Sequence, residues 1–301
     1  MPKIYDLSIL IVTYKTRELV LKCIQSSIES CQKAGLTNYQ IIVVDNASND
    51  GTVEEITQRY PMVKLIASAD NLGPARGYNK ALRVALPQSK YVMLLNSDIV
   101  LWEDTVTHMY SCLETHEDVS GVCGQLFFPN GQRQRIRTNI LDIKRADYSK
   151  PFRVTFVGTG FNMIRWQAYE QVGLYDENYY FYNEDLDWAE RARRLKLKFI
   201  LVPEAKVYHH LSQGSKQNYS AIIKELYKSN LYFFKKFYNP IIVSIAYGAI
   251  RLENWLAIRK LIKEAKDSNT TEERKIEIAK SLDVLNEAKQ ELIRYRKTGV
   301  F

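Results

Sequence analysis

Cysteine is scarce in this sequence, and its placement excludes two kinds of chemistry. The chain has four cysteines in 301 residues and no CxxC spacing. A cysteine zinc cluster and a dithiol redox pair are therefore not indicated. The cysteines stand in apolar or helical contexts, which predicts small buried hydrophobes in a reducing compartment. They are Cys23, Cys31, Cys112 and Cys123.

Long hydrophobic runs are also missing. The segment MPKIYDLSILIVTY has a short apolar run approached through Asp6, and no small-residue cleavage site comes after it, so it is unlike a signal peptide. The longest apolar stretch, residues 241–250, has ten residues, whereas a membrane-spanning helix needs about 20. We therefore expect a cytoplasmic protein, with peripheral association at the inner face of the cell membrane left open.

Negative charge is in short supply at the C-terminal end. Nearly all of the net charge of +8 lies in residues 216–301, which hold 17 Lys and Arg against 10 Asp and Glu. Such a surface suits an anionic membrane or a lipid-linked phosphate, and a solvated helical face would explain it equally well. We expect no nucleic-acid partner, because the sequence has no basic stripe with interleaved stacking aromatics.

A regular alternation of strands and helices is present in the first 100 residues. Continuous apolar, β-branched runs predict strands at 8–13, 40–44, 64–67 and 91–95, and helical spacing predicts helices at 18–34, 52–60 and 77–85. This alternation predicts an α/β fold with a mostly parallel sheet flanked by helices. Ligands then bind beyond the carboxyl ends of the strands, where Thr13, Asp45 and residues 96–98 stand.

The rest of the sequence is less regular at first and then wholly helical. Strands are predicted at 121–128, 154–164 and 199–208, a helix at 187–197, and a mobile basic loop at 133–145. Further helices are predicted at 222–238, 241–266 and 272–296, with a break at Pro240 and a cap at Thr270 or Thr271. We therefore expect one domain in residues 1–215 and a basic amphipathic helical region in residues 216–301.

Two loops of the first half carry residues suited to a nucleotide. The segment VVDNASNDGT places Asp45 at a strand end, where its carboxylate could accept hydrogen bonds from a base or ribose, cap a helix or bind a cation. The segment NLGPARGYN places Arg76 between glycines just before a helix, and backbone N–H groups at a helix start favour phosphate. A glycine-rich turn with a surface arginine explains this second segment better when it stands alone.

The segment NSD, residues 96–98, closes the fourth predicted strand. A divalent cation held by a strand-end carboxylate neutralises the negative charge that builds on a leaving diphosphate, and Asp98 is the natural ligand. The usual form of this motif has acids at both ends, and here Asn96 replaces the first. An ordinary polar turn is the alternative.

An acidic cluster, NEDLDW at residues 183–188, comes after a run of four aromatic residues. Its three carboxylates repel one another, so the cluster destabilises the fold unless a cation or a function compensates. A single displacement by a hydroxyl needs one base to take the proton, and Asp185 is our choice. Asp187 fits better the alternative, an acid at a helix N-terminus.

Two adjacent histidines stand after the last predicted strand. Histidine at a strand end can complete a metal shell or contact a diphosphate. Taken alone, the pair His209 and His210 is more typical of a structural role.

In this order and at this spacing, the segments resemble glycosyltransferase family 2, inverting enzymes with the Rossmann-like GT-A fold. The resemblance covers roughly residues 6–215 and rests on SILIVTYK, VVDNASNDGT, NLGPARGYN, LLNSD, GTGFNMIR, GLYDENYYFYNEDLDWAERAR and PEAKVYHH. Within the family, the sequence is most similar to bacterial rhamnosyltransferases that use dTDP-L-rhamnose. The resemblance implies a nucleotide-binding part at about 1–98 and an acceptor-binding part at about 99–215.

The resemblance also implies roles for individual residues. Asp98 matches the direct ligand of a divalent metal, Mg²⁺ or Mn²⁺, and Asp185 matches the catalytic base. His209 matches the metal-proximal histidine by register from Ala205, whereas the distance to Ser215 favours His210. Glu184 and Gly160 match the acceptor side. The nucleotide-sugar donor would be held by Thr13, Tyr14, Asp45, Arg76, Asn96 and Ser97.

The implied function is transfer of L-rhamnose from dTDP-L-rhamnose to a hydroxyl of a glycan or lipid-linked acceptor, in bacterial cell-surface polysaccharide synthesis. The first alternative is a family 2 transferase that uses a different UDP- or dTDP-sugar. A nucleotidyltransferase should show a glycine-rich basic loop after the first strand, where this sequence has TYKTREL. Asn96 gives some support to an inactive sugar-binding homologue, and Asp98 and Asp185 argue against it. A homodimer through the C-terminal helices is the remaining partner prediction.

Overall fold

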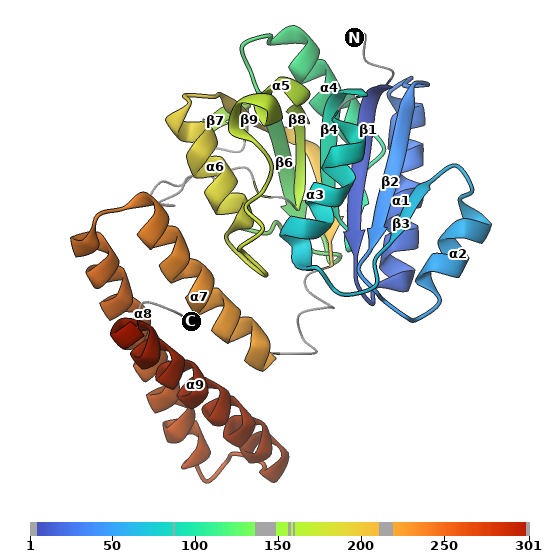
Figure 1. Cartoon of the computed structure of the whole chain (residues 1–301). Helices are drawn as coiled ribbons and strands as arrows, with labels where there is room; N and C mark the ends of the chain where they lie inside the picture. Colours follow the sequence, from blue (N-terminus) through green and yellow to red (C-terminus); the bar gives the residue numbers. More distant parts are fainter. Residues whose placement is uncertain are drawn as a thin grey trace. The chain divides into compact units, whose positions relative to one another are not determined.

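The structure is a computed structural model that describes residues 5–86, 88–135, 149–155, 158, 160–210 and 219–298. The chain forms two compact units, shown in Figure 1. The sheet unit comprises Met1–Tyr180 and Glu184–Gly214, and the helical unit comprises Phe181–Asn183 and Ser215–Phe301. The sheet unit carries nearly every residue to which the sequence assigns chemistry.

The sheet unit is built on a nine-stranded sheet with the order β3-β2-β1-β4-β8-β6-β9-β5, and β7 pairs with β9. The first four strands are parallel to one another, whereas β8 is antiparallel to both β4 and β6. The strands are β1 (Tyr5–Thr13), β2 (Tyr39–Asp45), β3 (Lys64–Ala67), β4 (Ser89–Asn96), β5 (Ile99–Leu101), β6 (Gly121–Phe127), β7 (Phe152–Val154), β8 (Phe161–Arg165) and β9 (Phe199–His209).

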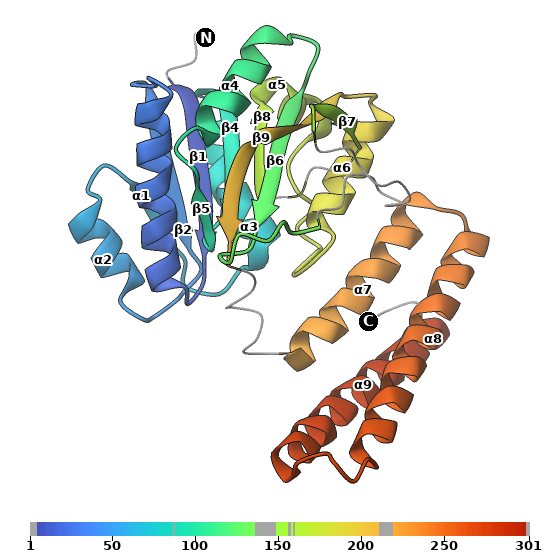
Figure 2. The same ribbon diagram turned by 180° about the vertical axis from the view of Figure 1, so that it is seen from behind.

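Helices cover both faces of this sheet, as the opposite views in Figures 1 and 2 show. One hydrophobic cluster joins Ile9 and Ile11 to side chains of α1, α2 and α4, and the other joins Leu10 to side chains of α3, α5 and α6. Successive side chains of a strand point to opposite faces, so a continuous apolar run is what a doubly covered strand requires. The helices are α1 (Arg17–Lys33), α2 (Thr52–Arg59), α3 (Gly73–Ala85), α4 (Thr105–Thr115), α5 (Trp166–Val172) and α6 (Glu184–Arg194).

The predicted α/β fold class is confirmed, and the second half of the sheet shows where the sequence-based boundaries fail. The strand expected at 154–164 is two separate strands, β7 and β8, and the helix expected at 187–197 begins at Glu184. The short elements β5, α4 and α5 were not predicted, because their apolar patterns are brief. Most of the mobile loop predicted at 133–145, namely residues 136–145, lies outside the described residues.

The helical unit contains α7 (Tyr219–Phe237), α8 (Pro240–Ala265) and α9 (Glu272–Thr298), packed around Tyr227, Leu231, Tyr247, Ile250, Ala288 and Leu292. The break at Pro240 has a local cause, since Asn239 Oδ1 accepts hydrogen bonds from the backbone N–H groups of Ile241 and Ile242 at 3.1 Å. The last helix is capped by Thr271, whose Oγ1 accepts from Arg274 N at 3.3 Å.

Helix α8 corrects one expectation from the sequence. The ten-residue apolar run lies within a helix of 26 residues, and by length and composition alone this helix could cross a membrane. Within the described residues it is the one helix that meets these criteria, and most of its apolar window is exposed.

The cysteines lie where small hydrophobes are expected. Cys23, Cys31 and Cys123 are buried and Cys112 is half-buried, all as free thiols. Burial raises the pKa of Cys31 and of Cys123 to about 12, which leaves both protonated and unreactive near neutral pH.

Candidate functional site

The carboxyl ends of β1 and β4 are joined by a chain of hydroxyl groups. Thr13 Oγ1 lies 2.9 Å from Thr16 Oγ1, which in turn lies 2.7 Å from Ser97 Oγ. Thr13 and Ser97 were predicted to contact the donor, and Thr16 was not. The signal for Thr16 was weak, because a threonine before a helix is commonly read as a cap.

Asp45 lies at the end of β2, paired in register with Thr13 on β1. Its Oδ2 accepts a hydrogen bond from Ser48 N at 3.0 Å, which shapes the next loop of the chain. Its Oδ1 is buried and has no hydrogen-bond partner within the described part of the chain. Buried polar atoms are nearly always satisfied, so this oxygen is suited to a donor from a ligand such as a nucleoside.

Tyr14 and Arg76 lie on the loops that surround these strand ends. Tyr14 is partly buried, with Lys15 Nζ 5.4 Å from its ring centroid. Arg76 is exposed in the first turn of α3, where the backbone N–H groups and the guanidinium together favour an anion. Helix α3 begins at Gly73, whose φ is +72°. A Cβ there would lie 2.1 Å from Tyr180 O, so only glycine fits.

Asn96 and Gly160 lie against each other. Asn96 N donates to Gly160 O at 3.0 Å, and a Cβ on Gly160 would lie 3.1 Å from Asn96 Nδ2. Asn96 Oδ1 lies 3.1 Å from the hydroxyl of Tyr78, which also lies 2.9 Å from Leu95 O. Burial raises the pKa of Tyr78 well above its usual range, so this hydroxyl remains a donor. The neutral side chain at position 96 therefore serves partly to hold the strand end in place.

Asp98 and His209 come together from distant parts of the sequence. The antiparallel pairing of β5 with β9 sets Ile99 opposite His209, and this register brings His209 Nε2 to 3.4 Å from Asp98 Oδ1. His210 meets the same residue through its backbone N–H, which donates to Asp98 O at 3.0 Å. The geometry thus favours His209 over His210 as the imidazole partner of Asp98.

Gln134, which the sequence did not single out, fixes the imidazole of His209. Gln134 Nε2 donates to the backbone carbonyls of His209 at 2.7 Å and of Phe127 at 3.3 Å, so its Oε1 faces His209 Nδ1 at 3.0 Å. An amide oxygen can only accept, and Nδ1 must therefore carry the proton. In the neutral ring, Nε2 is then the atom with a free lone pair, and it faces Asp98.

This arrangement fits a divalent cation. The described residues contain no cluster of three or more His, Cys, Asp or Glu side chains of metal-binding geometry. Mg²⁺ and similar ions are commonly held by one or two protein side chains and completed by substrate phosphates and water. One carboxylate and one imidazole with a fixed tautomer are a suitable donor set for that mode of binding.

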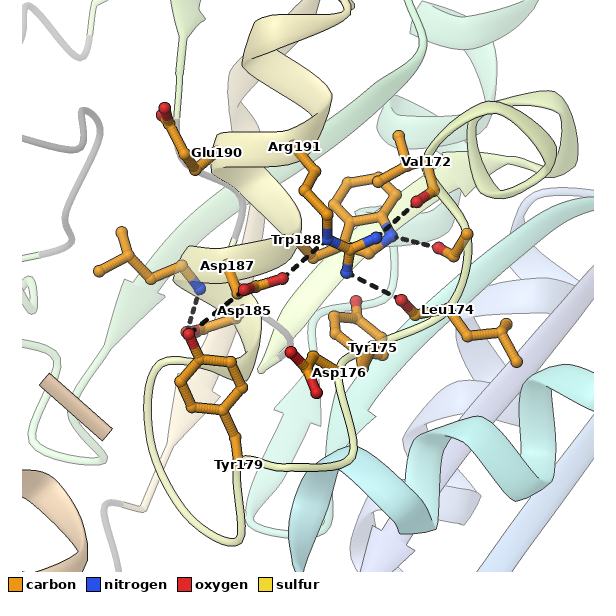
Figure 3. Close-up of polar contacts among 12 residues, drawn as sticks. Val172, Leu174, Tyr175, Asp176, Tyr179, Asp185, Asp187, Trp188, Glu190 and Arg191 are labelled. Atoms are coloured by element: carbon orange, nitrogen blue, oxygen red, sulfur yellow. Dashed lines mark hydrogen bonds and ion pairs between the residues drawn. The ribbon is translucent and has the colours of Figure 1, made fainter. Parts of the chain in front are cut away.

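The carboxylates of α6 have separate surroundings, shown in Figure 3. Asp187 is fully buried; it pairs with Arg191 Nε at 2.7 Å and accepts from Tyr179 OH at 3.2 Å. Arg191 also donates to the backbone carbonyls of Val172 and Leu174, so this pair ties α6 to the preceding loop. Asp187 is therefore structural. Asp185 lies two residues earlier and is partly exposed, and Glu184 is the buried first residue of the helix.

Helix α3 holds the segment that leads to the acidic cluster. Asn79 Nδ2 donates to Tyr175 O and to Glu177 Oε1 at 2.9 Å, and Tyr175 N donates to Asn79 Oδ1 at 3.0 Å. Arg83 pairs with Glu177 at 2.7 Å. Through these contacts, α3 holds the GLYDE segment in place.

A cavity of about 420 Å³ lies away from these residues, around Tyr91, Glu114 and Arg165. Three of its charged groups, on Lys90, Glu114 and Arg165, already have protein partners. Arg165 donates to the carbonyls of Val119, Leu113 and His116, and Glu114 accepts from Lys90 and Tyr91. We therefore regard it as a structural feature.

The fold and the strand-end site together define the GT-A class, in which a Rossmann-like first half is joined to a mixed second half. The chain belongs to the family described as "Glycosyl transferase family 2", whose sequence profile matches residues 8–173. The resemblance inferred from the motifs is thereby confirmed.

Sequence relatives include two enzymes with rhamnosyl transfer in their names. The N-acetylglucosaminyl-diphospho-decaprenol L-rhamnosyltransferase of Mycobacterium tuberculosis is 22% identical over 64% of this chain and 73% of that protein. The dTDP-rhamnosyl transferase RfbF of Shigella flexneri is 22% identical over 59% and 62%. The low-salt glycan biosynthesis hexosyltransferase Agl10 of Haloferax volcanii is 23% identical over 86% of each chain.

Solved structures with the same fold include TarS 1–349 of S. aureus in complex with UDP, with a TM-score of 0.53 and 15% identity over 75% of this chain and 65% of that one. GalNAc-T7 with UDP, GalNAc and Mn²⁺ has a TM-score of 0.58 and 12% identity over 98% and 58%. At these identities the likeness shows the fold alone.

Proposed function

We propose that this protein transfers L-rhamnose from dTDP-L-rhamnose to a hydroxyl of a glycan or lipid-linked acceptor, with inversion at the anomeric carbon, in bacterial cell-surface polysaccharide synthesis. The observation that carries the enzymatic part is the Asp98–His209 pair, with an Nε2–Oδ1 distance of 3.4 Å and the imidazole tautomer fixed by Gln134. The choice of rhamnose rests on the names of two relatives.

The donor would lie across the carboxyl ends of the parallel strands. Asp45 Oδ1, buried without a described partner, suits the nucleoside. The hydroxyls of Thr13 and Ser97 suit ribose or phosphate oxygens, with Tyr14 beside them and Asn96 closing the strand. Arg76, exposed at the start of α3, suits the diphosphate.

Asp98 and His209 would hold Mg²⁺ or Mn²⁺, which when bound supplies positive charge to stabilise the leaving diphosphate. Asp185 takes the proton of the acceptor hydroxyl as that oxygen attacks the anomeric carbon. The new C–O bond forms while the bond from that carbon to the diphosphate oxygen breaks, and its electron pair leaves with dTDP. One displacement inverts the configuration. Glu184 and Gly160 would lie on the acceptor side of this reaction.

A donor screen tests this function. Purified protein with Mn²⁺ is offered dTDP-L-rhamnose and a series of UDP- and dTDP-sugars, and binding, donor hydrolysis and the anomeric configuration of any product are measured by calorimetry and NMR. Selective use of dTDP-L-rhamnose is the expected result. Use of another sugar nucleotide would support the glycosyltransferase activity and change the proposed donor sugar. Binding without turnover would indicate an inactive homologue, and release of pyrophosphate from a nucleoside triphosphate would indicate a nucleotidyltransferase.

We also propose that the helical unit binds the anionic inner surface of the cell membrane, where a lipid-linked acceptor would lie. Helix α8 exposes large apolar side chains at helical spacing: Ile241 at 72%, Ile245 at 66%, Leu252 at 56%, Trp255 at 46% and Leu256 at 52%. The guanidinium of Arg259 lies 4.3 Å from the ring centroid of Trp255. Exposed apolar residues beside basic ones are typical of helices in a membrane interface.

Vesicle binding tests the membrane proposal. Full-length protein should sediment with anionic vesicles at low salt and less at high salt. Leu252→Ser together with Leu256→Ser should reduce binding, whereas Ile276→Ser, an equally exposed change on α9, should not. If the protein does not sediment with anionic vesicles at low salt, the proposal is wrong. A dimer that the two α8 substitutions dissociate would then assign this face to a second copy of the chain.

A further inference from the structure

The segment Phe181–Asn183 belongs to a different unit from its neighbours in the sequence. Tyr180 and Glu184 belong to the sheet unit, whereas the three residues between them belong to the helical unit. Tyr182 and Asn183 have φ values of 66° and 65°. This left-handed region is disfavoured for residues with a Cβ, and it is rare for a side chain as large as tyrosine. Two such residues in succession persist only where the surroundings hold them.

Helix α7 supplies contacts that hold this segment. Ser229 Oγ donates to the backbone carbonyl of Phe181 at 2.8 Å, and Asn183 Nδ2 donates to Asn230 Oδ1 at 2.8 Å. Ser229 is 4% exposed, so its hydrogen bond is shielded from water. Tyr227 and Leu231, on either side of these residues, are buried in the core of the helical unit. The two contacts are therefore made from a firmly packed part of α7.

The candidate base comes directly after this segment. Asn183 is succeeded by Glu184, the first residue of α6, and then by Asp185. The later part of α6 is fixed by the buried Asp187–Arg191 pair (Figure 3). No helical turn precedes the first turn of α6. The backbone of Phe181–Asn183 therefore determines the direction in which the chain enters the helix.

We propose that Ser229 and Asn230 are positioning residues for transfer: by holding Phe181–Asn183 in its left-handed conformation, they set the position of the Asp185 carboxylate. This inference rests on the proposed role of Asp185 as the base.

The test uses the full-length protein with donor and acceptor saturation curves. Ser229→Ala and Asn230→Ala should each lower kcat about tenfold to a hundredfold, the range expected from small misplacement of a catalytic group. The dissociation constant for dTDP in Mn²⁺ should stay within about twofold, because the nucleotide would contact neither residue. Asn230→Asp keeps an oxygen that accepts from Asn183, and Ser229→Thr keeps the hydroxyl, so both should restore most of kcat. Ser281→Ala and Asn286→Ala on α9 are the matched controls.

A double-mutant cycle separates positioning from general damage. In an Asp185→Asn background, Asn230→Ala should lower the residual rate no further, because Asn230 acts through Asp185. Asn183→Gly removes the same hydrogen bond to Asn230 from the other side, and glycine adopts the positive φ without strain. This variant should fold normally and have a lower kcat.

Three outcomes would overturn the inference: full kcat in Ser229→Ala and Asn230→Ala, full kcat in Asn183→Gly, or an equal further loss in the Asp185→Asn background. Full activity of Asp185→Asn would instead overturn the proposed role of Asp185 as the base. That result is distinguishable from the three outcomes above, because it needs no substitution at Ser229, Asn230 or Asn183.

Discussion

In the first half of the sheet unit, the candidate site residues stand at the carboxyl ends of parallel strands, whereas in the second half they lie on a helix start and an antiparallel strand. Thr13, Asp45 and Asn96 occupy adjacent ends of β1, β2 and β4, and their positions result from backbone register. Asp185 and His209 instead depend on side-chain contacts, through the Asp187–Arg191 pair that anchors α6 and through Gln134.

This difference has a consequence for mutation. A side chain at a parallel strand end keeps its place when its neighbours change, since main-chain hydrogen bonds hold it. A side chain placed by polar contacts moves when a contact is removed. Substitutions near the site should therefore reduce binding directly in the first half, and act through positioning in the second.

The largest effect on turnover is expected from Asp185→Asn. The amide keeps the shape of the carboxylate and cannot take a proton, so kcat should fall by about 10²–10⁴-fold with little change in donor affinity. Steady-state kinetics and calorimetry with dTDP measure the two quantities. A loss below about tenfold would remove Asp185 from the role of base.

Asp98→Ala should remove metal-dependent donor binding. The expected donor affinity in Mn²⁺ equals that of the unchanged protein in EDTA, because one of two proposed protein ligands is lost. Calorimetric titrations with and without EDTA give the comparison. Full transferase activity of the unchanged protein in EDTA would exclude the metal and return Asp98 to an ordinary turn residue.

Asp187→Asn should act on stability, in contrast to its neighbour Asp185. Removing one member of a buried ion pair leaves Arg191 without its charge partner and typically costs about 3–5 kcal/mol. Chemical denaturation should show this loss, whereas Asp185→Asn should leave the unfolding midpoint nearly unchanged. Equal midpoints for the two variants would contradict the division of roles within α6.

Gln134→Leu should weaken metal binding without removing a ligand. His209 would lose the acceptor that keeps its proton on Nδ1, and loss of such supporting contacts typically lowers metal affinity about 10–100-fold. Mn²⁺ titration measured by electron paramagnetic resonance detects this directly. Gln132→Leu, an exposed change on the same segment, is the control and should leave affinity unaltered.

The smallest effect is expected from Glu177→Gln. Hydrogen bonds from Asn79 and then Arg83 lower the pKa of Glu177. A lowered folded-state pKa contributes stability above the unfolded value of about 4.3, and the contribution is lost as pH falls through the folded value. Because this pair is substantially exposed, the variant should lose less than about 1 kcal/mol at neutral pH. Its unfolding curve should approach that of the unchanged protein as pH falls through the folded-state pKa and Glu177 becomes protonated in both states.

Local patterns in the amino-acid sequence were enough to define the parallel half of the sheet, the polar residues at its strand ends and the family. Periodicity and strand-end polarity are local signals. A strand covered on both faces, such as β1, must be apolar throughout, and the residue that follows it at the carboxyl edge of the sheet can be polar. Asp45 and Asp98 could be located for this reason alone.

The folded chain was needed to show what holds the structural acid of α6, and to distinguish the histidine that faces Asp98 from its neighbour. The sequence favoured Asp185 as the base and Asp187 as an acid at the helix start, and the partners of Asp187, Arg191 and Tyr179, became visible only in the folded chain. His209 was distinguished from His210 by the register of β9 against β5. Gln134 lies 75 residues from His209, and contacts across such separations depend on how strands and loops pack, which no local pattern records.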